Sequence, residues 1–175
     1  MDLEIEVKVY ADDLAAIETR LQQLGAVFTG SMHQTDRYFT HPQRDFALTD
    51  EALRIRIVDD RAFMTYKGRK MDRLSKTREE IEVAVGNAAA AMRLLERLGF
   101  TPIAAVRKLR REYQLGEYTI CLDDVAGLGT FVEVEARGTD IEKARDGALA
   151  LLNELTLFRN ERRSYLELLL ESTSR

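Results

Sequence analysis

Leu3-Glu4-Ile5-Glu6-Val7-Lys8-Val9 alternates strictly between apolar and charged residues, and this stretch decides the fold. Successive side chains of an extended strand point to opposite faces, so one face of this strand is apolar and the other carries only charges. The same alternation returns at residues 53–57, 80–83 and 130–136. Further strand candidates, rich in β-branched or aromatic residues, lie at 62–67, 105–113 and 117–123. The pattern predicts several strands that share one design.

Segments between these strands repeat their apolar residues at helical spacing. Asp12 or Asp13 can cap the first helix, and Asn87 can cap the second. Thr139, with Glu142 three residues later, forms a candidate capping box for the third. We therefore expect four helices, at about residues 13–25, 87–99, 139–155 and 164–171.

The chain contains an internal sequence repeat. Glu4-Ile-Glu-Val-Lys-Val recurs 76 positions later as Glu80-Ile-Glu-Val-Ala-Val, and each copy precedes a helix that ends Leu-x-x-Leu-Gly. Tyr38 and Tyr113 then lie in charged strand candidates. We interpret the repeat as the duplication of a β-α-β-β-β unit. Two copies supply eight strands, which suffice to close a small barrel. The predicted organisation is one domain over 1–175, with halves at about 1–75 and 76–137 and C-terminal helices beyond.

Length and composition narrow the class of protein. The 175 residues fit one domain, and 26 Lys+Arg against 30 Asp+Glu give a net charge of −4, which argues against a nucleic-acid partner. Cys121 is the single cysteine, so no internal disulfide can form. The start of the chain lacks the basic and apolar regions of a signal peptide, and no apolar run approaches the roughly 18 residues of a membrane span. We expect a cytoplasmic protein without a membrane partner.

The charged faces of the strands are sorted by sign. Like charges form pairs two residues apart, at Glu4/Glu6, Glu133/Glu135, Arg54/Arg56 and Lys108/Arg110. In all, seven acids and six bases occupy these faces: Glu4, Glu6, Glu80, Glu82, Asp123, Glu133 and Glu135, against Lys8, Arg54, Arg56, Lys67, Lys108 and Arg110. A half-exposed sheet also alternates polar and apolar residues, so a solvated outer face is the simpler interpretation. The sorting by sign argues against a solvated outer face, because a protein surface usually intersperses positive and negative charges.

The alternative to a solvated face is a charged interior. If helices cover the outside of a closed sheet, the charged faces line a wet tunnel instead of the usual apolar filling. Paired carboxylates are the hard oxygen ligands that Mg²⁺ or Mn²⁺ prefers. Arginine and lysine suit phosphate oxygens. The inventory therefore predicts a site for a polyphosphate and a divalent cation.

The motifs resemble those of the CYTH superfamily, the triphosphate tunnel metalloenzymes. The Glu4-x-Glu6-x-Lys8 pattern is followed in family order by matches at 35–39, 51–56, 65–68, 106–113, 123–135 and 164–169. The chain resembles the class IV adenylyl cyclase branch most, through His41-x-x-Arg44-Asp45-Phe46 and the Ser164-Tyr-Leu-Glu ending. The resemblance implies an α+β fold: an eight-stranded antiparallel closed β-barrel with helices packed outside.

The resemblance also implies roles for the charged residues. The residues expected to hold Mg²⁺ or Mn²⁺ are Glu4, Glu6, Glu133 and Glu135, with Asp123 and Glu82 assisting. Those expected to hold the triphosphate are Lys8, Arg54, Arg56, Lys67, Lys108 and Arg110. The catalytic set is Glu4, Glu6, Lys8, Glu133 and Glu135. Arg137 is either a further tunnel base or already outside.

Three functions remain open at this point. The leading hypothesis is an adenylyl cyclase that converts ATP to 3′,5′-cyclic AMP and pyrophosphate, with metal activation of the ribose 3′-hydroxyl. The second is a triphosphatase acting on inorganic triphosphate, thiamine triphosphate or a nucleoside triphosphate. The third is a polyphosphate- or nucleotide-binding module without turnover.

Two segments have alternative interpretations. The basic stretch 69–78 is either a solvated connection between strands or a mobile lid over the tunnel mouth. The leucines at 166 and 168–170 either pack in the core or form the seam of a homodimer.

Overall fold

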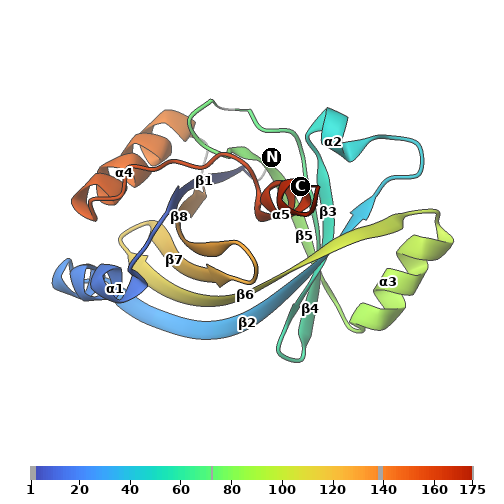
Figure 1. Cartoon of the computed structure of the whole chain (residues 1–175), viewed down its shortest axis with the longest axis horizontal. Coiled ribbons are helices and arrows are strands. Elements are labelled where there is room, and N and C mark those ends of the chain that lie inside the picture. Colours follow the sequence, from blue (N-terminus) through green and yellow to red (C-terminus); the bar gives the residue numbers. More distant parts are fainter. Residues whose placement is uncertain (1–2, 72, 138–139, 175) are drawn as a thin grey trace.

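Eight antiparallel strands close into a barrel in the order β1-β5-β4-β3-β2-β6-β7-β8 (Figure 1). The structure is a computed structural model that describes residues 3–71, 73–137 and 140–174. The strands of the described chain are β1 (Leu3–Tyr10), β2 (Val27–Thr40), β3 (Ala52–Val58), β4 (Arg61–Lys67), β5 (Arg78–Val85), β6 (Thr101–Leu115), β7 (Tyr118–Val125) and β8 (Gly129–Arg137). The helices are α1 (Leu14–Gln23), α2 (Phe46–Thr49), α3 (Ala88–Arg97), α4 (Ile141–Glu154) and α5 (Tyr165–Thr173). The predicted α+β barrel is confirmed.

Strand β2 is longer than the sequence indicated, and with β6 it forms the longest ladder of the barrel (Figure 1). Its first half, from Val27 to His33, is largely exposed on both faces, so it lacks the alternation that marks the other strands. This half of β2 is instead a strand because it pairs with β6. The β2–β6 register runs from Val27↔Gln114 to Thr40↔Thr101. The short helix α2 between β2 and β3 was also not predicted.

The helices begin where side-chain oxygens can cap them. Asp13, not Asp12, caps α1 by accepting from Ala16 N at 3.0 Å, and Asn87 caps α3 as expected. The expectation for α4 was wrong: its cap is Asp140, which accepts from Lys143 N at 3.0 Å, whereas Thr139 lies outside the described residues. At α5, Ser164 and Glu167 complete a reciprocal capping box.

The helices α1 and α4 cover one outer side of the barrel. Ile17, Leu21 and Leu152 of these helices pack on Val7 and Val134, which belong to the apolar outer faces of β1 and β8. On another side, α3 packs Leu95 against the outer face of β3. Burying the apolar strand faces under helices leaves the opposite faces to the barrel interior, as the tunnel hypothesis requires.

Helix α5 is placed differently, across one end of the barrel (Figure 1). Its Tyr165 and Leu168 pack with Val106, Val125 and Phe131, which share the inward parity of the charged residues. The interior is therefore apolar and closed at this end. Leu168 is buried, and Leu170 remains 40% exposed, so the leucine run packs partly in the core. The homodimer stays a prediction.

The order of the elements repeats. Apart from α2, both β1-α1-β2-β3-β4 and β5-α3-β6-β7-β8 follow the predicted β-α-β-β-β pattern. The division into halves at 75/76 and the origin of the repeat stay predictions. Among the described helices, none combines the length and the apolar composition needed to cross a membrane.

Candidate functional site

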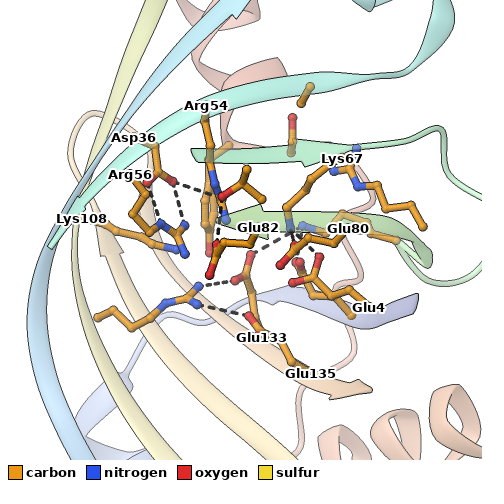
Figure 2. Close-up of a pocket in the computed structure, with 18 of the residues that line it drawn as sticks. Glu4, Asp36, Arg54, Arg56, Lys67, Glu80, Glu82, Lys108, Glu133 and Glu135 are labelled. Carbon is orange, nitrogen blue, oxygen red and sulfur yellow. Dashed lines mark hydrogen bonds and ion pairs between the residues drawn. The ribbon is translucent and has the colours of Figure 1, made fainter. Parts of the chain in front are cut away.

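A charged cavity of about 160 Å³ lies inside the barrel (Figure 2). Eight acids line it: Glu4, Glu6, Asp36, Glu80, Glu82, Glu112, Glu133 and Glu135. Eight bases face them: Arg54, Arg56, Lys67, Lys76, Arg78, Lys108, Arg110 and Arg137. We call this the charged cavity. The acid and base rows of separate strands therefore meet in one interior space, and a solvated outer face is excluded as their location.

The acid row is built by the pairing of β1 with β8. Glu6 stands opposite Glu135 in the register, and each strand contributes carboxylates at alternate positions. Glu4, Glu6 and Glu135 each offer an oxygen atom, and these atoms lie within 4.8 Å of one another. Three clustered carboxylates are a fitting donor set for Mg²⁺ or Mn²⁺. Glu133 instead receives hydrogen bonds from Arg110 and lies 3.6 Å from Lys76.

Burial and the repulsion between neighbouring carboxylates shift the pKa values of the acid row. Burial, with the negative charges of Glu4, Glu133 and Glu6, raises the pKa of Glu135 to about 7 despite the opposing effect of Arg110. Burial and Glu133 also raise the pKa of Glu6. At Glu4, burial opposes ionisation, but the charge and hydrogen bond of Lys67, a hydrogen bond with Glu80 and the charge of Arg54 together lower the pKa. The acid row thus holds more negative charge than its neighbours fully compensate, which favours binding a cation.

Each basic pair is oriented by one buried aspartate. Asp36 accepts from Arg56 Nε at 2.7 Å and from Arg54 at 3.3 Å (Figure 2). Asp123 accepts from Lys108 at 2.8 Å and from Arg110 Nε at 2.7 Å. The shared carboxylate keeps two like charges side by side, and their remaining N–H groups are available to an anion.

The structure places Asp123 and Asp36 where the sequence alone did not indicate. Asp123 was expected to assist the metal, yet it is fully buried behind the basic pair and does not line the charged cavity. Asp36 was not singled out, although it lies in the matched motif at 35–39 and does line the cavity. Its neighbours on β2 gave no alternation that would have identified it.

The bases on β4 and β8 pair with acids of β5 and β1. Lys67 contacts Glu4 and, at 2.6 Å, Glu80. Arg137 lies 3.0 Å from Glu80 and lines the cavity, but its side chain is 59% exposed, so it lies at the edge of the cavity rather than within it. Glu82 also lines the cavity and accepts from Thr65 Oγ1 at 2.9 Å.

Lys8 was expected to hold the triphosphate, but it does not line the charged cavity. Its side chain has the inward parity of Glu4 and Glu6 but lies deeper, where its ammonium donates to the Arg163 carbonyl and sits 4.0 Å from the centre of the Tyr165 ring. Burial, together with the charge of Lys76, lowers the pKa of Lys8 well below its usual value. The C-terminal segment covers this lysine.

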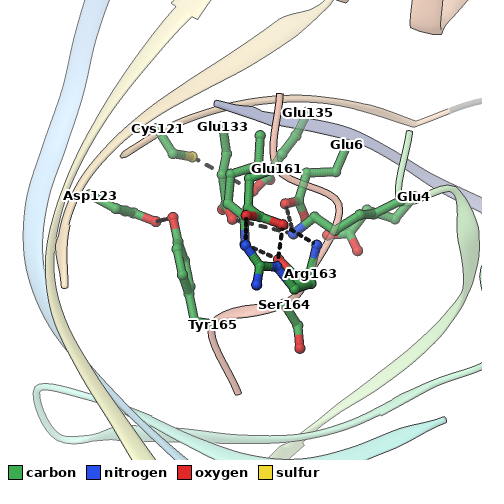
Figure 3. Close-up of polar contacts among 12 residues, drawn as sticks. Glu4, Glu6, Cys121, Asp123, Glu133, Glu135, Glu161, Arg163, Ser164 and Tyr165 are labelled. Atoms are coloured by element: carbon green, nitrogen blue, oxygen red, sulfur yellow. Dashed lines mark hydrogen bonds and ion pairs between the residues drawn. The ribbon is translucent and has the colours of Figure 1, made fainter. Parts of the chain in front are cut away.

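The C-terminal segment closes the apolar end of the barrel through Tyr165 (Figure 3). The Tyr165 hydroxyl donates to Asp123 at 2.9 Å, and its ring lies 4.9 Å from the Lys108 ammonium. Tyr165 therefore forms the floor of the charged cavity. The sequence signal was its place in the final motif match, which gave no hint of a position inside the barrel.

The segment 69–78 is not a solvated connection throughout. Residues 75–78 are buried, and both Lys76 and Arg78 line the charged cavity. The Lys76 backbone N–H donates to the Glu6 carbonyl at 2.8 Å, and its ammonium pairs with the Glu6 carboxylate. Two cationic side chains of the site were thus missed. Lys76 lies in a loop, which has no periodicity from which to infer its direction, whereas Arg78 begins β5 and shares the inward parity of Glu80 and Glu82.

Known proteins agree with this geometry. The family model described as "CYTH domain" matches residues 2–167. The chain belongs to the CYTH family. Over 171 residues it is 40% identical to a Methanocaldococcus jannaschii protein named "Putative adenylate cyclase MJ0240", covering 95% of this chain and 98% of that one.

Solved structures share this fold. The PH1819 protein from Pyrococcus horikoshii superimposes with a TM-score of 0.90 at 42% identity, covering 97% of this chain and 99% of that one. A Hippeastrum protein, HpAC1, described as a "putative adenylyl cyclase" with a dominant triphosphatase activity, has a TM-score of 0.73, with coverage of 98% and 96%. At 19% identity the latter likeness shows the fold alone. CYTH enzymes generally depend on a divalent metal, and the carboxylate cluster of this chain fits one.

Proposed function

We propose that this CYTH protein is a metal-dependent adenylyl cyclase that converts ATP to 3′,5′-cyclic AMP and pyrophosphate. One observation carries the proposal: clustered carboxylates and two aspartate-held basic pairs face one another across a single buried cavity. The name of the relative at 40% identity supports the reaction class.

The basic residues would bind the triphosphate. Arg54 and Arg56 from β3 and Lys108 and Arg110 from β6 approach from neighbouring walls of the barrel. A nucleoside triphosphate carries about four negative charges, and paired guanidinium groups bind phosphate oxygens in a fixed orientation. The phosphate chain would replace the contacts that Arg110 makes with Glu133 and Glu135.

The reaction joins the ribose 3′-oxygen to the α-phosphorus and breaks the bond from the α-phosphorus to the bridging oxygen of the leaving pyrophosphate. Glu4, Glu6 and Glu135 would hold the divalent cation, which supplies Lewis-acid activation of the 3′-hydroxyl. The hydroxyl proton passes to water. Lys108 and Arg110 would stabilise the charge that grows on pyrophosphate, since Asp123 holds them rigidly at the cavity wall.

Hydrolysis of a triphosphate is the second candidate. The charged cavity by itself has the size of a phosphate chain rather than of a whole nucleotide, and the Hippeastrum neighbour is described as mainly a triphosphatase. In that reaction water attacks the terminal phosphorus, the bond from this phosphorus to the bridging oxygen breaks, and orthophosphate and the remaining diphosphate are released. The physiological substrate could then be inorganic triphosphate, thiamine triphosphate or a nucleoside triphosphate.

Product analysis distinguishes the two reactions. The protein is incubated with ATP, and separately with tripolyphosphate, in the presence of Mg²⁺ or Mn²⁺, and the products are separated. Cyclic AMP and pyrophosphate in equal amounts are expected from ATP. Orthophosphate without cyclic AMP would reject the cyclase proposal in favour of hydrolysis.

The Glu133→Ala variant tests whether the protein is an enzyme at all. We expect loss of turnover, because Glu133 orients Lys76 and Arg110, and Arg110 would stabilise the charge that grows on pyrophosphate. Nucleotide binding should be retained, because Glu133 does not itself contact the triphosphate. Absence of turnover in the wild-type protein, with tighter nucleotide binding in the variant, would instead indicate a binding module.

A further inference from the structure

A second cavity opens beside the charged one. Its volume is about 500 Å³, and residues of β2, α2 and α5 line it. Large apolar side chains form most of its wall: Phe39, Phe46, Ile103, Leu166 and Leu170. We call it the apolar pocket.

The two cavities share part of their walls. Tyr38, Ala52, Arg78 and Ser164 line both the charged cavity and the apolar pocket. A molecule with a charged part and an apolar part could therefore occupy both at once. The sizes agree with such a division, since about 160 Å³ is small for a ligand site whereas about 500 Å³ is within the usual range of roughly 300–1,000 Å³.

Arg78 marks the boundary between the two cavities. It is only 6% exposed, and its Nε has no hydrogen-bond partner among the residues that the structure describes. A buried guanidinium N–H without a partner is costly unless a ligand accepts a hydrogen bond from it. A phosphate oxygen at the boundary of the two cavities would accept this hydrogen bond.

The charges of the apolar pocket argue against a second anionic group. Its wall carries the carboxylates of Asp45, Asp50, Glu51 and Glu167, and Arg78 is its one basic lining residue in the described chain. Lys70 pairs with Asp50 and Glu167, and Arg44 pairs with Glu51. A longer polyphosphate would therefore meet a single lining base there, against eight in the charged cavity. Carboxylates beside aromatic and aliphatic side chains instead suit a neutral ring with amino groups.

We infer that the apolar pocket binds the nucleoside of the substrate, with Arg78 at the phosphate nearest the ribose. The inference rests on the proposed function and deepens it, because it assigns the part of the protein that would distinguish ATP from inorganic triphosphate. It also assigns the specificity of the enzyme to α2 and α5, outside the charged cavity.

Direct binding measurements test this on the unmodified protein. Calorimetry with Mg²⁺ compares tripolyphosphate with α,β-methylene-ATP, an analogue that cannot release pyrophosphate. We expect the ATP analogue to bind at least about tenfold more tightly, although it carries less charge. Equal binding, or tighter binding of tripolyphosphate, would overturn the inference and leave a triphosphate enzyme. If neither tripolyphosphate nor the ATP analogue binds, the proposed function itself is overturned.

Two substitutions on α2 form a matched pair. Ala47 lines the apolar pocket, whereas its neighbour Leu48 does not line it and is 84% exposed. Ala47→Trp is expected to weaken binding of the ATP analogue about tenfold and to leave tripolyphosphate binding unchanged. Leu48→Trp should alter neither. General misfolding would weaken both ligands together, so tripolyphosphate serves as the internal control.

The same variants exclude another occupant. If a second copy of the chain fills the apolar pocket, Ala47→Trp would convert a dimer to a monomer in sedimentation experiments without weakening ATP binding. That outcome, or unchanged binding of both ligands, would overturn the assignment to a nucleoside.

Discussion

Asp36 and Asp123 are the residues on which the basic side of the site depends. Both are almost completely buried, and each carries two cationic partners. Burial alone would raise the pKa of Asp36, but Arg56 and Arg54 outweigh it and lower the pKa. These aspartates are therefore ionised at neutral pH and fix the direction of the phosphate-binding groups.

Replacing Asp36 should lower the stability of the protein, and binding of a polyphosphate should restore part of that stability. Asp36→Asn leaves two buried guanidinium groups without their carboxylate, which costs about 3–5 kcal/mol in comparable buried pairs. The free energy of unfolding in urea measures this loss. Tripolyphosphate should raise the melting temperature of the variant more than that of the wild type, since it supplies an anion to both arginines. Equal melting temperatures without ligand would contradict this role.

The acid row predicts a loss of metal affinity on a single substitution. Glu6→Gln removes one carboxylate from the cluster with Glu4 and Glu135 and should weaken Mn²⁺ binding roughly tenfold or more. Titration calorimetry with Mn²⁺ measures the change. Glu142→Gln, on the exposed face of α4, is the matched control and should bind Mn²⁺ as the wild type does. If Glu6→Gln binds Mn²⁺ normally, the metal site lies elsewhere.

At the scale of elements, the segment before α5 is fastened to β1. Glu161 N donates to the Lys8 carbonyl at 2.8 Å, and Tyr10 N donates to the Arg159 carbonyl at 3.0 Å. The Glu161 carboxylate accepts from Tyr10 Oη at 2.8 Å and from the Arg163 guanidinium (Figure 3). This anchor holds Tyr165 in the barrel.

The anchor should be sensitive to acid. Hydrogen bonds from Arg163, which outweigh the opposing effect of burial, lower the pKa of Glu161 to about 2 in the folded protein, against an ordinary value of 4.5. Its stabilisation is thus complete above about pH 4.5 and is lost as the pH falls towards 2. The difference in melting temperature between the wild type and Glu161→Gln should narrow over that range. A constant difference would show that Glu161 does not act through its charge.

At the scale of the whole molecule, the outer core and the interior site are separate. Leu152 of α4 is 1% exposed and packs on the outward faces of the barrel strands, away from the charged cavity. Leu152→Ala should cost about 2–5 kcal/mol of stability through the cavity it leaves. Activity per folded molecule should be unchanged at low temperature. A loss of turnover in the fully folded variant, judged by circular dichroism, would show that the outer packing shapes the site.

Alternation was a sound guide to the strands and to the side of the sheet on which each charge lies. It predicted that Glu4, Arg54, Lys108 and Glu133 share an interior, as they do. It failed for β2, whose first half is exposed on both faces, and for Lys76, which a loop carries into the cavity. Periodicity exists only where one face is buried and the backbone is regular.

Strand parity was enough to predict which strand side chains point inward, because parity follows from the extended backbone. The depth of each side chain, and what covers it, became known from the folded barrel alone. Lys8 and Asp123 have the inward parity, yet Tyr165, more than forty residues from either along the chain, covers the one and binds the other. Such contacts depend on the path of the closed barrel and its C-terminal segment, which no local pattern encodes.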